Sequence, residues 1–259
     1  MRTVNAMPLE LITVPCLEDN YAFLLHNPDS EETLLVDAPE AAPIQAALDE
    51  RGWTLTDILL THHHWDHVDG LEPLRGTARV IGAKADARRL PALDLQVSEG
   101  DDLTLCGARA EVFDVSGHTV GHIAVYMADA GAVFTADSLM ALGCGRLFEG
   151  TPEMMWASLQ KLRALPPETR VCSGHEYTAT NAAFAATLEP DNPDLISRSA
   201  DITTARAEGR PTVPSTLAEE LRTNPFLRAD DPDLQAALNM TGRPAAEVFA
   251  HIRKKRDNF

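Results

Sequence analysis

Long apolar runs and paired cysteines are both missing from this chain of 259 residues. No stretch approaches the roughly 20 apolar residues that a membrane-spanning helix needs, so we expect no membrane segment. Residues 1–6 lack the apolar core of a secretory signal, which favours a cytoplasmic protein. The four cysteines stand far apart and form no C-x-x-C pair, which indicates reduced thiols rather than disulfides.

Positive charge is also scarce. Lys and Arg number 22 against 39 Asp and Glu, which gives a formal net charge of -17 at pH 7. A protein that binds a phosphate backbone needs a basic face, so the composition argues against a nucleic-acid partner. Basic residues gather locally in the tail, at positions 253–256. Composition alone favours a plain reading of that tail, in which the cations complement the dipole of a helix C-terminus.

A chain of this length with 44% hydrophobic residues can bury one large core, or one core with a smaller appended domain. Apolar runs bounded by turn residues predict strands, and apolar residues at helical spacing predict helices. The predicted strands are residues 10–14, 21–25, 33–36, 57–60, 78–82, 102–105, 110–115, 123–127, 132–135 and 170–173. The predicted helices before residue 177 are residues 41–51, 85–90 and 152–165.

Beyond residue 177 no strand-like run remains. Helices are predicted near residues 178–189, 193–208, 215–222, 232–239 and 244–256, with Pro and Gly between them. We therefore expect a mixed catalytic domain over residues 1–176 and a small helical domain over residues 177–259.

The stretch THHHWDH, residues 61–67, directly follows a predicted strand. Side chains alternate along an extended segment, so His62 and His64 point the same way and can hold one metal ion. Asp66 and His67 lie where the chain turns and can face a neighbouring point. One alternative is a solvated histidine-rich loop without a metal. A second is an expression tag, but a tag would be neither internal nor interrupted by other residue types.

Other predicted strand ends carry further histidine and aspartate side chains. Because seven candidates exceed what one tetrahedral ion with an open position requires, the pattern points to two ions. The cluster contains no thiolate, so zinc, iron and manganese are all admissible. Two such ions can share a carboxylate and a water whose pKa falls from about 15.7 toward about 7. The candidate ligands are His62, His64, Asp66, His67, His118, Asp137 and His175.

These motifs resemble the metallo-β-lactamase superfamily and, within it, the hydroxyacylglutathione hydrolases, or glyoxalases II. The array at residues 61–67 marks only the superfamily. More specific are residues 116–119, 134–138, 174–178 and 223–228, together with the basic tail. The resemblance implies an α+β fold, an αββα sandwich of two sheets flanked by helices, with a small all-helical C-terminal domain that helps to hold glutathione.

The resemblance also implies a role for each candidate ligand. His62, His64 and His118 would hold the first ion, Asp66, His67 and His175 the second, and Asp137 would bridge them. The implied reaction is hydrolysis of S-D-lactoylglutathione, or another S-2-hydroxyacylglutathione, to a 2-hydroxy acid and glutathione by a hydroxide that bridges two divalent ions. Zinc is the favoured ion, iron and manganese stay open, Asp66 and Asp137 count as catalytic, and a monomer is expected.

Glutathione has carboxylates, and the family places cations for them on the tail and on a glycine-rich loop, here residues 143–150. One common form of the family pattern has Lys and Tyr where this chain has Arg146 and Phe148. Arg keeps the charge with a different donor geometry, whereas Phe148 lacks the hydroxyl for a hydrogen bond worth about 0.5 to 1.5 kcal/mol. The implied substrate-binding residues are Arg146, Phe148, Tyr177, Arg253 and Arg256.

Several neighbouring residues have plainer interpretations. We expect His63 to support the ligand loop without holding metal, and His122 to be a structural histidine. Trp65 is expected to pack and stiffen the loop, and His26 and His251 to lie at the surface. Only Arg146 lies close to Cys144 in the sequence, so a catalytic thiol is not expected there.

Three other functions stay open at this point. A persulfide dioxygenase shares much of the motif but uses one iron and oxygen, and the long helical C-terminal region with its basic tail favours the hydrolase over it. A β-lactam or RNA-processing hydrolase is disfavoured by the expected lack of export and by the acidity. A non-catalytic metal-dependent binding protein would load metal without turning over a thioester.

Overall fold

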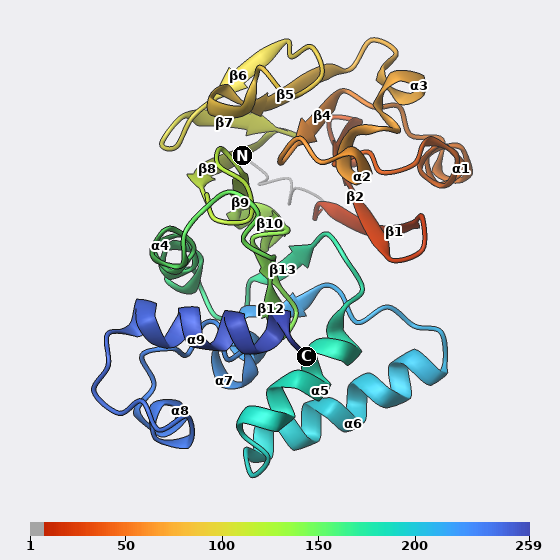
Figure 1. The fold of residues 1–259 in the computed structure, drawn as a ribbon. Helices are drawn as coiled ribbons and strands as arrows, with labels where there is room; N and C mark the ends of the chain where they lie inside the picture. Colours follow the sequence, from red (N-terminus) through yellow and green to blue (C-terminus); the bar gives the residue numbers. More distant parts are fainter. Residues whose placement is uncertain (1–7) are drawn as a thin grey trace, which may run out of the picture. The chain divides into compact units, whose positions relative to one another are not determined.

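The computed structural model describes residues 8–259, which form two compact units (Figure 1). Unit 1 contains the chain up to Asp114 together with Ile123–Phe134, and unit 2 contains Val115–His122 and Thr135–Phe259. The expectation drawn from residues 1–6 lies outside the described residues. Within residues 8–259 no helix combines the length and the apolar character needed to cross a membrane. The domain boundary expected at residue 177 does not coincide with this division and stays a prediction.

Unit 1 is built on a six-stranded sheet in the order β1-β2-β3-β4-β5-β6. The first three strands form an antiparallel meander, and β3 to β6 run parallel. The strands are β1 Glu10–Cys16, β2 Asn20–Asn27, β3 Glu32–Val36, β4 Asp57–Leu60, β5 Arg79–Ala83 and β6 Leu95–Val97.

Parallel neighbours need crossover connections, and helices supply them in unit 1. The first crossover, α1 (Ala41–Arg51), buries Ile44 and Leu48 in the apolar cluster that also contains β-strand residues of this sheet. Gly52 ends α1 in the left-handed conformation, with φ 68°, which glycine adopts without steric cost. Two short helices, α2 (Trp65–Val68) and α3 (Leu71–Arg75), lie between β4 and β5 in the sequence.

A second set of strands in unit 1 is antiparallel, in the order β7-β8-β9-β10. The strands are β7 Asp102–Leu105, β8 Ala108–Asp114, β9 Ile123–Met127 and β10 Ala132–Ala136, whose last two residues belong to unit 2. Phe23 of β2 packs on Phe134 of β10, with ring centroids 5.9 Å apart, and Cys106 donates to Leu25 O across 3.2 Å. β7–β8 and β9–β10 each form a hairpin of consecutive strands, and within unit 1 these contacts join the two sets of strands.

Unit 2 continues from the end of β10, which neighbours β13 (Arg170–Ser173) and then β14 (Ser215–Thr216). A second small hairpin joins β11 (Leu139–Met140) to β12 (Gly143–Cys144). The helices of unit 2 are α4 Pro152–Arg163, α5 Thr178–Leu188, α6 Pro193–Ala207, α7 Leu217–Thr223, α8 Pro232–Ala237 and α9 Ala245–Asp257. In Figure 1, α5 and α6 lie side by side, and α9 lies against α4.

The predicted helices of unit 2 begin where their caps place them. Thr151, Asn192 and Asp231 each accept a backbone hydrogen bond at the start of a helix, and a proline follows each of them. Thr216 and Glu219 form a reciprocal capping box that starts α7.

Two secondary-structure predictions were wrong. The segment 85–90 is only a 3₁₀ turn, Lys84–Asp86, because Pro91 disfavours a helical Leu90 before it. The region after residue 177 also contains a strand: Ser215 and Thr216 pair antiparallel with Val171 and Arg170. A two-residue strand carries too little pattern to be read from sequence, since its partner lies far away in the chain.

Glu220 anchors unit 2 from its interior. It is fully buried, accepts from Leu142 N at 2.8 Å and from Asn224 Nδ2 at 3.0 Å, and forms an ion pair with buried Arg198. The Glu220 carboxylate therefore neutralises the buried Arg198 guanidinium and also accepts hydrogen bonds from two further buried donors.

We expect Glu220→Ala to lower the free energy of unfolding by about 3 to 5 kcal/mol, because it leaves the Arg198 guanidinium buried without its counter-charge. Urea denaturation followed by circular dichroism measures the change. The control is Glu247→Ala, which removes an exposed pair with Arg243 and is expected to cost less than about 1 kcal/mol. Equal midpoints for the two variants would contradict the anchoring role.

Candidate metal centre

Histidine and aspartate side chains form one cluster in each unit. In unit 1 the cluster consists of His62, His64, Asp66 and His67, on the loop after β4 and on α2. In unit 2 it consists of His118, Asp137 and His175, which follow β8, β10 and β13. Taken together, these seven side chains are consistent with a binuclear metal site.

The unit 1 cluster is compact. The ring centroid of His62 lies 4.7 Å from that of His64 and 4.3 Å from that of His67. The His67 Nε2 atom lies 3.8 Å from Asp66 Oδ2. Asn20 donates to both the backbone oxygen and Oδ2 of Asp66, at 3.0 and 3.1 Å, so the orientation of this carboxylate is fixed from β2.

A buried carboxylate, Asp37, sets the proton positions in this cluster. Asp37 Oδ2 lies 2.8 Å from His67 Nδ1, and the carboxylate also accepts from Thr61 N and Thr61 Oγ1, each at 2.9 Å. An ionised carboxylate only accepts, so the hydrogen on His67 sits on Nδ1. The Nε2 lone pair of His67 is therefore directed away from Asp37 and can hold a metal ion.

The same reasoning fixes His62. The Thr61 hydroxyl has one hydrogen, and it donates this hydrogen in a hydrogen bond to Asp37. In the 3.0 Å contact with His62 Nδ1, Thr61 Oγ1 is therefore the acceptor. His62 thus also presents Nε2 as a lone pair. One carboxylate, acting directly and through one hydroxyl, puts two neighbouring imidazoles into the tautomer that a metal ligand needs.

Sequence reasoning assigned no role to Asp37 or Asn20. A signal for Asp37 existed: it directly follows β3, which runs parallel to β4 with Val36 beside Leu59. The carboxyl ends of parallel strands meet at one edge of a sheet, so Asp37 lies at the same edge as the end of β4 and the Thr61 that follows it. Its left-handed backbone, with φ 57°, is uncommon for a residue other than glycine and has no comparable signal in the sequence.

Asp137 is the centre of the unit 2 cluster. Its Oδ2 lies 3.4 Å from His118 Nε2, and its Oδ1 lies 3.3 Å from His175 Nε2. Each carboxylate oxygen therefore faces a different imidazole, which suits a carboxylate shared by two ions. His118 Nδ1 donates to Arg146 O at 2.7 Å, so this ring too presents Nε2 as a lone pair.

Glycine is required where the loop of residues 143–150 passes this cluster. A β-carbon on Gly145 would lie 2.0 Å from Asp137 O and 2.8 Å from His118 Nδ1. Only glycine permits that approach, which lets the next residue, Arg146, reach His118 with its carbonyl oxygen. The glycine-rich character of the loop thus has a packing reason within unit 2.

The five predicted substrate-binding residues all lie in unit 2, but their surroundings differ. Arg146 and Phe148 are exposed, and the ring of Tyr177 stacks on His175 with centroids 4.7 Å apart. Arg253 is buried: it donates to Cys144 O at 2.9 Å and pairs with Asp257 at 2.9 Å. Its guanidinium therefore holds the loop of residues 143–150 onto α9.

Of the two tail arginines, Arg256 has more freedom than Arg253 to meet a ligand. It is half-buried, and its guanidinium lies 3.3 Å from Asn181 Oδ1. Partial burial and the neighbouring Arg253 charge lower the pKa of Arg256 from its ordinary value, with Arg146 adding to the effect. This crowding of cations would be relieved by a bound carboxylate.

The structure corrects two plainer interpretations. Trp65 is 64% exposed and does not pack into the protein, because α2 turns its ring outward. His26 is buried and does not lie at the surface. Its ring contacts Thr33 Oγ1 at 2.9 Å and stacks on Trp53. His63 lies 3.0 Å from buried Asp86. His122 is buried and His251 half-buried, and their roles stay predictions.

Family models match nearly the whole chain. Residues 18–175 match the model described as the metallo-beta-lactamase superfamily, and residues 176–259 match the one described as the hydroxyacylglutathione hydrolase C-terminus. Curated relatives agree. A hydroxyacylglutathione hydrolase of Ruegeria pomeroyi is 66% identical over 98% of this chain and 100% of its own length. One from Jannaschia sp. is 64% identical, over 96% and 98%.

Solved structures support the same fold. ETHE1 from Myxococcus xanthus superposes with a TM-score of 0.66 at 25% identity, over 96% of this chain and 90% of that one. TTHA1623, described in a di-iron-bound form, gives a TM-score of 0.60 at 27% identity, over 84% and 99%. The predicted fold class, a metallo-β-lactamase fold with two sheets and a helical C-terminal region, is confirmed.

Cys144 is expected to be chemically inert in the folded protein. Burial raises the pKa of the Cys144 thiol to about 11, although the Arg253 charge acts in the opposite direction. At pH 8 its thiolate fraction should therefore be about a hundred-fold below that of an exposed cysteine. Iodoacetamide labelling read by mass spectrometry should modify Cys144 only after urea unfolding. Labelling at equal rates in both states would contradict the protected thiol.

Proposed function

Because the chain belongs to the hydroxyacylglutathione hydrolases of the metallo-β-lactamase superfamily, we propose that it hydrolyses S-D-lactoylglutathione and related S-2-hydroxyacylglutathiones. The products are a 2-hydroxy acid, D-lactate for the first substrate, and glutathione. The observation that carries the proposal is the set of fixed tautomers: His62, His67 and His118 each present Nε2 as a lone pair.

We assign the metal ligands as follows. His62, His64 and His118 hold one ion, Asp66, His67 and His175 hold the other, and Asp137 bridges them. When bound, the two ions supply a hydroxide at neutral pH and stabilise the oxyanion that develops on the thioester carbonyl. Zinc is the proposed ion for this imidazole and carboxylate donor set, and iron and manganese suit it as well. We also propose that the chain acts as a monomer.

The chain's own residues position these ligands. Asp37 keeps the hydrogen of His67 on Nδ1, Arg146 O does so for His118, and Asn20 fixes the Asp66 carboxylate. Asp66 and Asp137 are the residues for which we propose a catalytic role. The proposed division of labour follows the predicted domains, with residues 1–176 carrying the chemistry and residues 177–259 contributing to glutathione binding.

Glutathione recognition is assigned to unit 2. Arg256 and the exposed Arg146 supply positive charge for its carboxylates, and Tyr177 offers a hydroxyl beside His175. Phe148 contributes only an apolar edge, with its ring 5.3 Å from that of His118. Arg253 acts mainly by holding the loop of residues 143–150, since its guanidinium is buried against Cys144 O and Asp257.

The test of the proposal is turnover of S-D-lactoylglutathione by protein of measured metal content, with released glutathione detected by a thiol reagent. We expect two ions per chain and loss of turnover when a chelator removes them. One iron per chain, with oxygen consumption on glutathione persulfide, would replace the hydrolase by a dioxygenase. Full metal loading without thioester turnover would indicate a binding protein.

Asp137→Ala should remove the shared carboxylate and reduce metal content in the same preparation. Loss of a ligand exceeds loss of its supporting hydrogen bond, so we expect turnover to fall by more than about 100-fold. Metal analysis and kinetics report the two effects together. Asp69→Ala, an exposed aspartate on the same loop as the histidines, is the matched control and should retain both. Near-normal metal content in the Asp137 variant would place the bridge elsewhere.

Single substitutions in the tail should separate binding from support. Arg256→Ala removes a contact remote from the scissile bond, so KM for S-D-lactoylglutathione should rise with kcat little changed. Arg253→Ala should lower the melting temperature and change kcat and KM together, because the loop that holds His118 loosens. Lys254→Ala, an exposed neighbour, should leave all three parameters near wild type. An unchanged KM in the Arg256 variant would return the tail to a helix-dipole role.

A further inference from the structure

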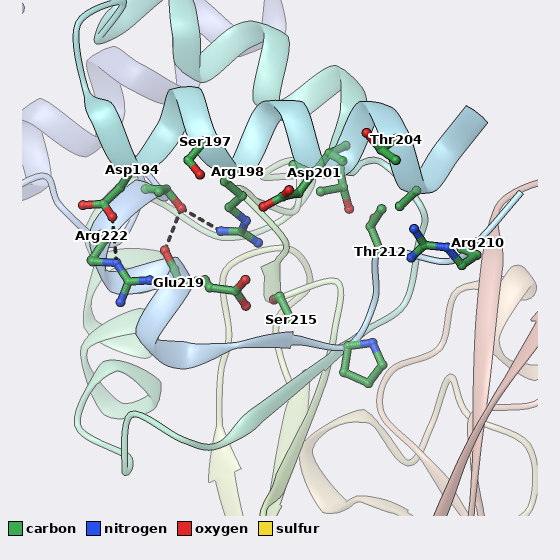
Figure 2. A pocket seen from close by; sticks show the side chains of 15 residues that line it. Asp194, Ser197, Arg198, Asp201, Thr204, Arg210, Thr212, Ser215, Glu219 and Arg222 are labelled. Atoms are coloured by element: carbon green, nitrogen blue, oxygen red, sulfur yellow. Dashed lines mark hydrogen bonds and ion pairs between the residues drawn. The ribbon is translucent and has the colours of Figure 1, made fainter. Parts of the chain in front are cut away.

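Unit 2 contains a second polar cavity that none of the proposed metal ligands or glutathione contacts line. It has a volume of about 490 Å³ and lies between α6 and the segment that runs from Arg210 into α7. Figure 2 shows Arg198 and Asp201 extending from α6 toward the side that carries Ser215 and Glu219. The volume is in the range of ordinary small-molecule sites.

Two buried hydroxyls line this cavity without a partner among the described residues. Thr178 Oγ1 and Ser215 Oγ make no hydrogen bond, although Thr178 is 1% and Ser215 5% exposed. A buried hydroxyl that stays unsatisfied costs free energy, so such groups are rare in native proteins. Both belong to residues that line the same cavity, so a polar ligand held there would supply the missing partner.

Arg198 adds an unused charge-assisted donor set to the same wall. It is buried, and it donates from one nitrogen to Thr223 Oγ1, at 2.7 Å, and from another to the Glu220 carboxylate. A guanidinium has five N–H donors, so three remain for a ligand. Because Glu220 neutralises Arg198, the folded protein tolerates this charge with the cavity open.

The cavity presents both signs of charge in equal number. Three arginines and three carboxylates line it: Arg198, Arg210, Arg222, Asp194, Asp201 and Glu219. Arg222 pairs with Asp194, and Arg210 with Glu208 outside the lining, in half-exposed ion pairs that are weak enough to open. Asp201 forms no ion pair and accepts no side-chain hydrogen bond within residues 8–259. A plain anion would meet three carboxylates here.

We propose that this cavity binds a small zwitterion with an α-amino acid group, its carboxylate on Arg198 and the Ser215 hydroxyl and its ammonium on Asp201. Arg198 and Asp201 stand three residues apart on α6, where side chains are about 5 to 6 Å apart at Cβ and share one face. That spacing suits a ligand whose ammonium and carboxylate groups are attached to the same carbon atom. Thr178 and the rim arginines would meet the remainder of the ligand.

Isothermal titration of the metal-loaded, full-length protein with L-glutamine tests the proposal. We expect a dissociation constant of about 1 mM or tighter, which is ordinary for a ligand of this size. Ser215→Ala should weaken binding by about three- to tenfold, as expected for one lost hydrogen bond, and Asp201→Asn by about tenfold. Without ligand, Ser215→Ala should keep or raise the melting temperature, because it removes an unsatisfied buried hydroxyl.

Two controls make the outcome specific. Ser199→Ala, which removes a hydroxyl on α6 that bonds Leu195 O outside the cavity lining, should bind L-glutamine like the wild type. Butyrate, which has the carboxylate without the ammonium, should bind at least tenfold more weakly than L-glutamine. L-Glutamine can also chelate metal ions, but binding at the metal centre would persist in the Ser215 and Asp201 variants.

Three results would overturn the proposal. The first is no heat of binding up to about 20 mM L-glutamine, well above the expected dissociation constant. The second is wild-type affinity in both the Ser215→Ala and Asp201→Asn proteins, which would assign the binding to the metal centre. The third is equal binding of butyrate together with tighter binding to Asp201→Asn, which would identify a plain anion site. Thioester turnover is not part of any of these readouts, so their failure is distinct from failure of the proposed function.

Discussion

The tautomer of a histidine decides which ring nitrogen can hold a metal ion, and here hydrogen bonds at Nδ1 leave Nε2 as the lone pair of His62, His67 and His118. Asp37 accepts a hydrogen bond from His67 Nδ1. It also accepts one from the Thr61 hydroxyl, so Thr61 Oγ1 can accept a hydrogen bond from His62 Nδ1. A backbone oxygen, that of Arg146, does the same for His118 in the other unit. The clusters are thus ready for metal before an ion arrives, because the lone pairs are already directed away from the supporting bonds.

These arrangements place strained backbone next to the functional side chains. Asp37 itself has φ 57°, and Ala136, the residue before Asp137, has φ 40°. Left-handed conformations of residues other than glycine cost about 1 to 3 kcal/mol and persist only where the surroundings enforce them. In both cases a strand has just ended and the next carboxylate must face an imidazole. The hydrogen-bonded strands on either side hold these residues in their strained conformations.

The sequence predicted the strands and long helices well, because their apolar periodicity and caps are local properties, as at Thr151 and Gly52. It also led to His118, Asp137 and His175, since each follows a strand. It did not predict the strands β6, β11, β12 and β14, which are only two or three residues long and carry too little pattern. It also did not predict the role of Asp37, whose partners lie far away in the chain. Arg253 shows the same limit: its charge is visible in the sequence, but its burial against Cys144 O is a property of the fold. The position of Trp65 was misjudged because aromatic character alone does not say which side of α2 faces solvent.

The approach of Gly145 to Asp137 and His118 makes one short loop a shared component of two sites. The carbonyl oxygen of Arg146 accepts a hydrogen bond from His118, and its side chain is exposed. Under the proposed function, its backbone therefore supports a metal ligand, whereas its side chain contacts glutathione. When one ligand has fixed the conformation of Arg146, the second ligand would no longer pay the conformational entropy of fixing it. Thermodynamic linkage would make such an effect reciprocal: under the proposed function, a ligand held by the Arg146 side chain and one held by His118 would alter each other's affinity by the same factor.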